Sequence, residues 1–311
     1  MDFRLTEDQR ALRRGVRELL GRLFDREALR EAVDTPVLDR GLWRELGDAG
    51  FFSLRLPEEE GGVGLGLPEA VLVFEEAGRV LLPGPLVATH LAAGAVPGAA
   101  DGSVVVTSVD EGLVPWLDEA DVVLGDVTGA VPVRSVDPLT PLHRVPGPGG
   151  AVGAGSLGPA GAPSVVPTRP ALGGRLPATD GVLLTAAEQV GSAQATTDMA
   201  VSYARARSQF GQVVGGFQAV KHLCAGMLVR TELARAAVWA ASVTGDAVEV
   251  AGAKLLADDA AVRNARDCLQ VHGGMGFTWE ADVHLHLKRA WVRAELRMPA
   301  ARAEEAVAAG L

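Results

Sequence analysis

The sequence predicts a mostly helical protein with a small β region in its middle. Two zones, residues 1–95 and 181–311, carry apolar residues at helical spacing, and many of these are Ala and Leu, which favour helices. The zone between them, residues 96–180, is rich in Gly, Pro and Val. With 311 residues the chain is long enough for two or three packed domains, so we expect one domain for each zone.

The N-terminal zone carries signals for where its helices start and stop. Thr6 and Gln9 form a capping-box pattern, in which each side chain bonds the backbone N–H of the other residue. A later helix is expected between Pro68, which suits a first helical position, and Pro83, which ends it. The glycines of residues 61–66 follow no strand and lie in no βαβ pattern, so they indicate a turn-rich loop and not a dinucleotide site.

The central zone, residues 96–180, has short apolar runs separated by turn residues. The runs Ser103–Val109 and Asp121–Leu124 predict short β-strands. Residues 146–163 contain so much Gly and Pro that we expect a loop there. The sequence therefore predicts a reduced β-domain.

The C-terminal zone, residues 181–311, predicts a four-helix bundle. Its four apolar stripes begin at Leu183, Phe217, Val250 and Val283, and each continues at intervals of about three and four residues. The stripes are rich in Ala, which lets helices approach closely. A bundle of this kind also suits assembly with other subunits.

Composition and charge exclude several classes of function. The net charge is −10 with no run of Lys and Arg, which argues against binding to nucleic acids or anionic membranes. No run of about 18 apolar residues lacks charges and Pro, so no membrane-spanning helix is expected. Residues 1–9 lack the apolar core of a secretory signal, and Cys224 and Cys268 sit in apolar helical patterns typical of reduced thiols, so we expect a cytoplasmic protein. His284 and His286 lie two residues apart and face different ways on a helix, so no metal site is expected.

Two segments of the C-terminal zone are more specific than the overall pattern. The first is Arg207-Ser208-Gln209-Phe210-Gly211, followed by Phe217-Gln218-Ala219-Val220-Lys221-His222, and the second is Gln270-Val271-His272-Gly273-Gly274-Met275-Gly276-Phe277. Their order and spacing resemble those of acyl-CoA dehydrogenases. Residues 43–66 and 75–78 are similar to the first helical domain of that family. The resemblance covers residues 1–95 and 181–292 and is poor in the central zone.

The resemblance implies an acyl-CoA dehydrogenase-like fold and contact with the ADP half of FAD, which in this family lies across a subunit interface. Arg207 has a permanent charge on a planar fork that suits a pyrophosphate. Glutamine amides can bond ribose or adenine, Phe210 can pack on adenine, and a Gly-Gly pair lets the backbone approach a ligand closely. The residues implied to contact the cofactor are Arg207, Gln209, Phe210, Gln218, Gln270, Gly273 and Gly274.

The position of the catalytic base departs from the family pattern. These enzymes remove an α-proton of the thioester with a carboxylate while the β-hydrogen passes as hydride to the flavin. Counting from the Gly-Gly pair puts Arg297 where many members have this Glu, and Arg stays protonated. Other members place the base at the head of the first bundle helix, where this chain has Gly181. Glu188, Glu295 and Asp180 remain weak candidates, beside the alternative that the chain has no base.

The central zone also departs from the family, because the segments that touch the flavin ring are absent. A short chain with these features is similar to the short subunits of dehydrogenases that work as unlike pairs on steroid-derived or other bulky CoA thioesters. The resemblance implies an FAD-linked acyl-CoA dehydrogenase subunit for α,β-desaturation, active with a longer dehydrogenase subunit in a heterotetramer. It further implies an electron acceptor such as an electron-transfer flavoprotein. The alternatives are a homo-oligomer, or a catalytically incompetent binding subunit with the same fold.

Overall fold

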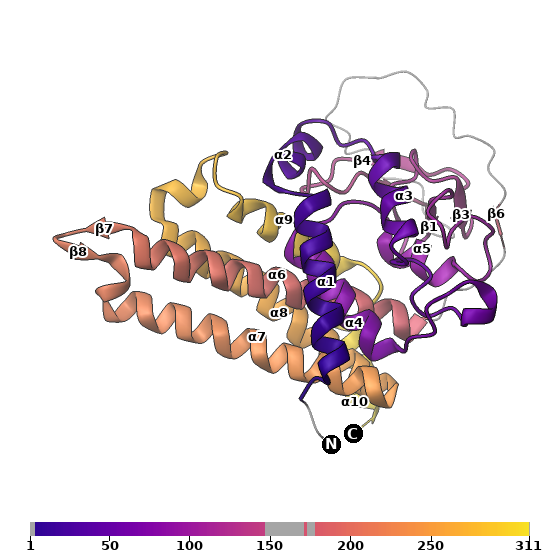
Figure 1. Cartoon of the computed structure of the whole chain (residues 1–311). Helices are drawn as coiled ribbons and strands as arrows, with labels where there is room; N and C mark the ends of the chain where they lie inside the picture. Colours follow the sequence, from indigo (N-terminus) through magenta and orange to yellow (C-terminus); the bar gives the residue numbers. More distant parts are fainter. Residues whose placement is uncertain (1–3, 147–170, 173–177, 311) are drawn as a thin grey trace.

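The structure, a computed structural model, describes residues 4–146, 171–172 and 178–310. Figure 1 shows long helices that extend side by side from a body of shorter helices and small strands. The mostly helical fold with a small β region is therefore confirmed. The loop expected at residues 146–163 lies outside the described residues except for Pro146.

The N-terminal zone folds as five short helices and one turn of 3-10 helix. The predicted capping box is present, with Gln9 N donating to Thr6 Oγ1 over 3.1 Å and Thr6 N donating to Gln9 Oε1 over 3.0 Å. The predicted loop around residues 61–66 follows the 3-10 turn, and the helix expected after Pro68 starts one residue earlier. These elements are α1 (Glu7–Leu23), α2 (Arg26–Asp34), α3 (Arg40–Asp48), η1 (Glu58–Glu60), α4 (Leu67–Arg79) and α5 (Leu86–Ala92).

The described strands of the central zone form two small sheets. The strands β1 (Val106–Ser108), β3 (Val122–Leu124) and β6 (Ala171–Leu172) pair in parallel, and β1 and β3 lie inside the two predicted runs. The strands β2 (Leu113–Pro115), β5 (Leu142–Arg144) and β4 (Val131–Val133) pair antiparallel in that order. The turn after β1 carries Asp110, and the loop between β4 and β5 carries Asp137.

The C-terminal zone contains the predicted bundle and one helix that the sequence patterns above did not predict. That helix is α10, which follows Pro299 and packs on α8. The bundle elements are α6 (Ala178–Ala206), the hairpin β7 (Ser208–Gln209) and β8 (Gln212–Val213), η2 (Val214–Gly216), α7 (Gln218–Thr244), α8 (Ala247–His272), η3 (Gly273–Phe277) and α9 (Val283–Glu295), followed by α10 (Ala300–Gly310). No helix in the described ranges is long and apolar enough to cross a membrane.

Helix α6 is the centre of the fold, because it packs on α4, α7, α8 and α9. Its crossing with α4 is close: a Cβ added to Gly78 would lie 2.0 Å from Glu188 O, and one added to Gly191 would lie 1.9 Å from Glu75 O. The main apolar core joins α6 to the N-terminal helices and to the strands through residues such as Trp43, Phe74 and Leu183. This core fixes the central strands beside the α6 face that bears Glu188.

Candidate functional site

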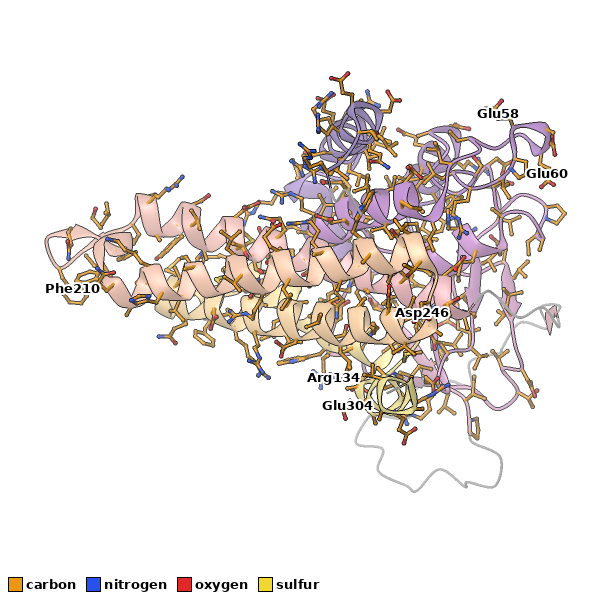
Figure 2. The ribbon with its side chains drawn as sticks, turned by 90° about the horizontal axis from the view of Figure 1, so that it is seen from below. Glu58, Glu60, Arg134, Phe210, Asp246 and Glu304 are labelled. Atoms are coloured by element: carbon orange, nitrogen blue, oxygen red, sulfur yellow. The ribbon has the colours of Figure 1, made fainter. Side chains whose placement is uncertain are left out.

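The predicted cofactor residues of the first segment lie at the free end of the bundle. Arg207 follows the last residue of α6, and Gln209 and Phe210 form one side and the tip of the β7–β8 hairpin (Figures 1 and 2). All three are exposed, and Phe210 keeps 89% of its surface accessible. Gln218 is exposed at the first position of α7, directly after the hairpin. The hairpin therefore presents polar and aromatic groups to the outside of the molecule.

The predicted residues of the second segment lie at the same end. Gln270 is exposed near the end of α8, and Gly273 ends the helix with φ 59° while its N–H donates to Gln270 O. A small apolar core joins the two segments. Tyr203, which packs against this core, stacks its ring on that of His272 with centroids 4.2 Å apart. The structure thus brings together all seven predicted residues on one exposed end.

The groups at this end fit the ADP half of a flavin nucleotide. The side chain of Arg207 makes no hydrogen bond or ion pair with the residues that the structure describes, so its guanidinium can bind an external anion. A Cβ added to Gly273 or Gly274 would meet nothing within 4 Å. The positive φ of Gly273 at the end of α8 explains that glycine, but the chain's own packing does not explain Gly274, whereas close approach by an external ligand or subunit would.

The histidines near the bundle have different surroundings and do not converge on one point. His286 is buried, and its Nδ1 lies 2.8 Å from Ser192 Oγ. His284 is half-buried and stacks on Trp279 with centroids 4.9 Å apart. Among the described residues, no group of three or more His, Cys, Asp or Glu could hold a metal ion.

Two of the three candidate bases, Asp180 and Glu295, lie outside the cavity described next. Asp180 pairs with Arg55 at 2.7 Å, and neither residue lines the cavity described next. Glu295 is exposed at the last residue of α9. Neither placement supplies the desolvated carboxylate that proton abstraction requires.

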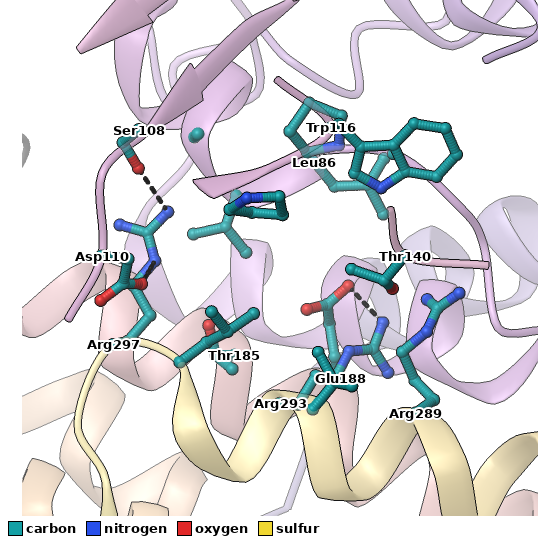
Figure 3. A pocket seen from close by; sticks show the side chains of 17 residues that line it. Leu86, Ser108, Asp110, Trp116, Thr140, Thr185, Glu188, Arg289, Arg293 and Arg297 are labelled. Atoms are coloured by element: carbon teal, nitrogen blue, oxygen red, sulfur yellow. Dashed lines mark hydrogen bonds and ion pairs between the residues drawn. The ribbon is translucent and has the colours of Figure 1, made fainter. Parts of the chain in front are cut away.

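Glu188, the third candidate, is buried beside a cavity between the central strands and α9 (Figure 3). Arg293 Nη2 donates to Glu188 Oε1 over 2.7 Å. Burial raises the pKa of Glu188, and the positive charges of Arg293 and its neighbours oppose this shift. Burial also lowers the pKa of Arg293 to about 10. Glu188 is therefore held in a buried ion pair.

Arg297, at the expected position of the family's base, lines the same cavity. Its Nε lies 3.2 Å from Asp110 Oδ2, and its Nη2 donates to Ser108 Oγ over 3.4 Å (Figure 3). Its guanidinium also packs on Gly181, the position of the alternative base, because a Cβ added there would lie 3.0 Å from Arg297 Nη1. A guanidinium cannot accept a proton, so neither position offers a base in this chain.

A third buried ion pair joins Arg289 to Asp137. Arg289 Nε donates to Asp137 Oδ2, and its two other nitrogens donate to Leu82 O over 3.2 Å and Leu139 O over 3.1 Å. The sequence patterns did not indicate Arg289, Arg293 or Asp137, and they indicated Glu188 only as a candidate base. The spacing of four between the two arginines would have placed them on one helix face, but their distant partners carry no local signal.

The cavity itself is small. It has a volume of about 60 Å³, whereas cofactor and drug sites are commonly ~300–1,000 Å³. An isoalloxazine ring or the thioester end of an acyl-CoA is too large for it. The exposed end of the bundle thus fits part of a nucleotide, whereas the charged cavity is too small for one.

Comparisons with known proteins agree with this geometry. The chain matches the family models described as acyl-CoA dehydrogenase N-terminal domain, over residues 6–103, and acyl-CoA dehydrogenase C-terminal domain, over residues 180–297. It is 34% identical to acyl-CoA dehydrogenase IpdE2 of Mycobacterium tuberculosis, over 93% of each protein. It is also 34% identical to acyl-CoA dehydrogenase FadE34 of the same organism, over 81% of this chain and 39% of that longer protein.

Solved structures show the same fold. One is the ChsE4–ChsE5 complex of Mycobacterium tuberculosis, with a TM-score of 0.80, 23% identity, and coverage of 99% of this chain and 98% of the solved chain. Another is a variant of the Tcur3481–Tcur3483 steroid ACAD, with a TM-score of 0.79, 24% identity, and coverage of 97% of each chain. The sequence relatives and the two matching domain models identify this chain as a member of the acyl-CoA dehydrogenase family.

Proposed function

We propose that this chain is the subunit of an FAD-linked acyl-CoA dehydrogenase that completes the ADP site, while a longer partner subunit supplies the catalytic base and the flavin-ring site. The observation that carries this proposal is the contact between Arg297 and Gly181. In this chain a cation and a glycine stand at the two positions where the family keeps its carboxylate. The exposed set from Arg207 to Gly274 is the part of the cofactor machinery that remains.

Each group at the exposed end has a chemical task in this proposal. Arg207 would bind the pyrophosphate, and the amides of Gln209, Gln218 and Gln270 would bond the ribose and adenine edges. Phe210 would pack on the adenine, and the Gly273–Gly274 backbone would let the nucleotide approach. When bound, FAD supplies the hydride acceptor for desaturation. The residues of this chain hold and orient the nucleotide across the interface.

The exposed apolar side chains near this end support assembly with a second subunit. Besides Phe210, the exposed large apolar residues there include Val213 in the hairpin, Leu228 and Val229 in α7, and Phe277 after the Gly-Gly pair. Large exposed apolar patches mark interaction sites more often than free surface. The similarity in fold to a ChsE4–ChsE5 complex and to a Tcur3481–Tcur3483 steroid ACAD favours an unlike partner.

The same similarities support a proposal for the substrate class. We infer an acyl-CoA with a bulky or steroid-derived acyl group, because one solved relative in fold is described as a steroid ACAD. The electrons would leave to an acceptor such as an electron-transfer flavoprotein. The cytoplasmic location expected from the sequence stays a prediction.

The test is co-expression with a candidate longer dehydrogenase subunit, followed by size-exclusion chromatography and counting of flavin per chain. One FAD per unlike pair, with anaerobic bleaching of the flavin by an acyl-CoA only in the pair, is the expected result. A homo-oligomer with one FAD per chain that an acyl-CoA reduces would overturn the proposal. A pair that binds FAD but is never reduced by any acyl-CoA would favour the second candidate, a non-catalytic binding subunit.

A further inference from the structure

A histidine lies among the exposed polar groups at the free end of the bundle. His272 is the last residue of α8, between Gln270 and Gly273, at the end that carries the β7–β8 hairpin (Figure 1). Its ring is half-buried and stacks on the ring of Tyr203, with centroids 4.2 Å apart and planes tilted by 28°. The resemblance to the family gave this side chain no part in binding the nucleotide.

Three contacts hold the His272 ring in one orientation. Its Nδ1 lies 2.8 Å from Cys268 O, one of the last carbonyls of α8. The ring of Tyr203 stacks against it. The turn η3 passes close to the base of the side chain, because a Cβ added to Gly276 would lie 3.0 Å from His272 Cβ. A side chain held in this way loses little further freedom when a ligand binds, which favours binding.

The hydrogen bond to Cys268 determines which ring nitrogen of His272 can accept. A carbonyl oxygen only accepts, so Nδ1 carries the proton of the neutral ring and Nε2 has a free lone pair. Nε2 has no hydrogen-bond partner among the described residues, and it is not one of their enclosed side-chain atoms that lack a partner. It is therefore open to solvent and to a ligand.

The Tyr203–His272 stack lies between the two cofactor segments. Tyr203 is in the last turn of α6, and Arg207 N donates to Tyr203 O over 2.9 Å, so Arg207 lies one turn from the stack. On the other side, Gly273 and Gly274 follow His272 directly, and the space beside both glycines is open. An adenosine that runs from a pyrophosphate on Arg207 toward the two glycines would pass His272. Its ribose hydroxyls and its adenine amino group are donors that suit a nitrogen acceptor.

We propose that His272 binds the adenosine of the nucleotide, with Nε2 accepting a hydrogen bond from a ribose hydroxyl or from the adenine amino group. Tyr203 is a positioning residue, which holds the ring of His272. This inference rests on the proposed function, because it needs the ADP half of FAD at this end of the bundle. The charge of Arg207 suits any pyrophosphate, whereas a neutral acceptor at His272 makes affinity depend on the nucleoside that is attached.

Two substitutions separate the acceptor from the stack. His272→Phe keeps a ring for Tyr203 and removes the acceptor, so the Kd for FAD of the co-purified complex should rise about five- to tenfold. His272→Gln removes the ring and keeps an amide oxygen near the place of Nε2, so the Kd should rise by about twofold or less. His284→Gln, which changes a histidine that stacks on Trp279, is the control and should leave the Kd unchanged. An unchanged Kd in His272→Phe would overturn the proposal, whatever the Kd of His272→Gln.

Nucleotide analogues identify the donor. ADP, its 2′-deoxy and 3′-deoxy forms, and inosine diphosphate are compared as competitors that release FAD from the complex, followed by flavin fluorescence. The analogue that lacks the donor should compete about five- to tenfold less well than ADP against the unmodified complex, and as well as ADP against His272→Phe. Equal competition by all four nucleotides, or a preference that His272→Phe leaves intact, would overturn the proposal.

Arg207→Ala, measured beside these variants, separates this inference from the proposed function. A higher Kd for FAD in Arg207→Ala with an unchanged Kd in His272→Phe would remove His272 from the site and leave the ADP site in place. Unchanged affinity in both variants, or a complex that holds no flavin, would remove the ADP site and His272 with it.

Discussion

The guanidinium of Arg297 packs against Gly181, with its Nη1 3.0 Å from the point that a Cβ on Gly181 would occupy. By resemblance to the family, these are the two alternative positions of the catalytic base. Their contact in space explains how a carboxylate at either one can serve the same reaction. It also means that one cation blocks both positions in this chain.

Restoring a carboxylate at one position should not create a catalyst. In Arg297→Glu the new side chain would lie beside Asp110, whose carboxylate would lose its ion pair while it remains buried. We expect a destabilisation of about 3–5 kcal/mol and no reduction of flavin by an acyl-CoA when the chain is purified alone. Arg297→Lys, which keeps a cation beside Asp110, is the matched control and should be milder. Measurable flavin bleaching by the Arg297→Glu chain would show that only the base was missing.

The ion pair between Arg289 and Asp137 should contribute strongly to the stability of the packing between α9 and the strand region. Arg289→Met would leave a fully buried carboxylate and two backbone carbonyls without their donor. The expected loss is about 3–5 kcal/mol of unfolding free energy in chemical denaturation. Arg302→Met, which removes an arginine that is 60% exposed, should cost about 0.5 kcal/mol or less. Similar losses in the two variants would mean that the buried pair adds no more than an exposed one.

Much of the fold was predictable because its signals are local. The capping box of Thr6 and Gln9, the stripe that starts at Leu183 and the valine-rich runs each lie within a few residues, and the structure confirms them. Helix α10 was missed although Pro299 and the alanines after it are a helix-start signal. That signal lies beyond the last residue of the family motif and beyond the four apolar stripes, the last of which lies in α9.

The cavity could be predicted only in part, because its charges pair across the chain. Counting from the Gly-Gly pair gave Arg297, and the resemblance gave Gly181. The partner of Arg289, however, lies 152 residues away in a loop that docks only in the folded protein. Glu188 was a candidate base, and only tertiary packing shows that it faces Arg293 at 2.7 Å. Residue spacing contains no information on which carboxylate a buried arginine meets.

His286 should make the protein less stable as the pH falls below about 6.5. Burial lowers its pKa to about 3, with further lowering by Arg293. The unfolded chain takes up a proton near pH 6.5 while the folded chain does not, so this stabilisation is complete above pH 6.5 and is lost toward pH 3. The slope for one such group is about 1.4 kcal/mol per pH unit.

The measurement is urea denaturation at several pH values for the unmodified protein, His286→Gln and His222→Gln. Asp110, Glu188 and Asp258 have raised pKa values and oppose the trend, but they contribute equally to all three proteins and cancel in the differences. His286→Gln should show the shallower loss on acidification, and His222→Gln, at an exposed site, should follow the unmodified protein. Parallel curves for all three proteins would mean that His286 is protonated without cost in the fold.

Arg207→Ala should weaken FAD binding in the assembled protein. Its side chain is exposed and makes no ion pair with the described residues, so the substitution removes no internal contact and should leave the stability of the chain nearly unchanged. Loss of one charge-assisted contact to the pyrophosphate should cost about 1.5–3 kcal/mol, which is roughly a tenfold to hundredfold increase in Kd.

The control is Arg263→Ala, which removes another exposed arginine, on α8, that pairs with Asp259 at 2.7 Å. Flavin affinity is measured by fluorescence during dilution of the co-purified complex, and the thermal midpoint of each variant is recorded beside it. A rise in Kd for Arg207→Ala with unchanged stability, and no change for Arg263→Ala, is the expected pattern. Equal affinities in the three proteins would remove Arg207 from the cofactor site.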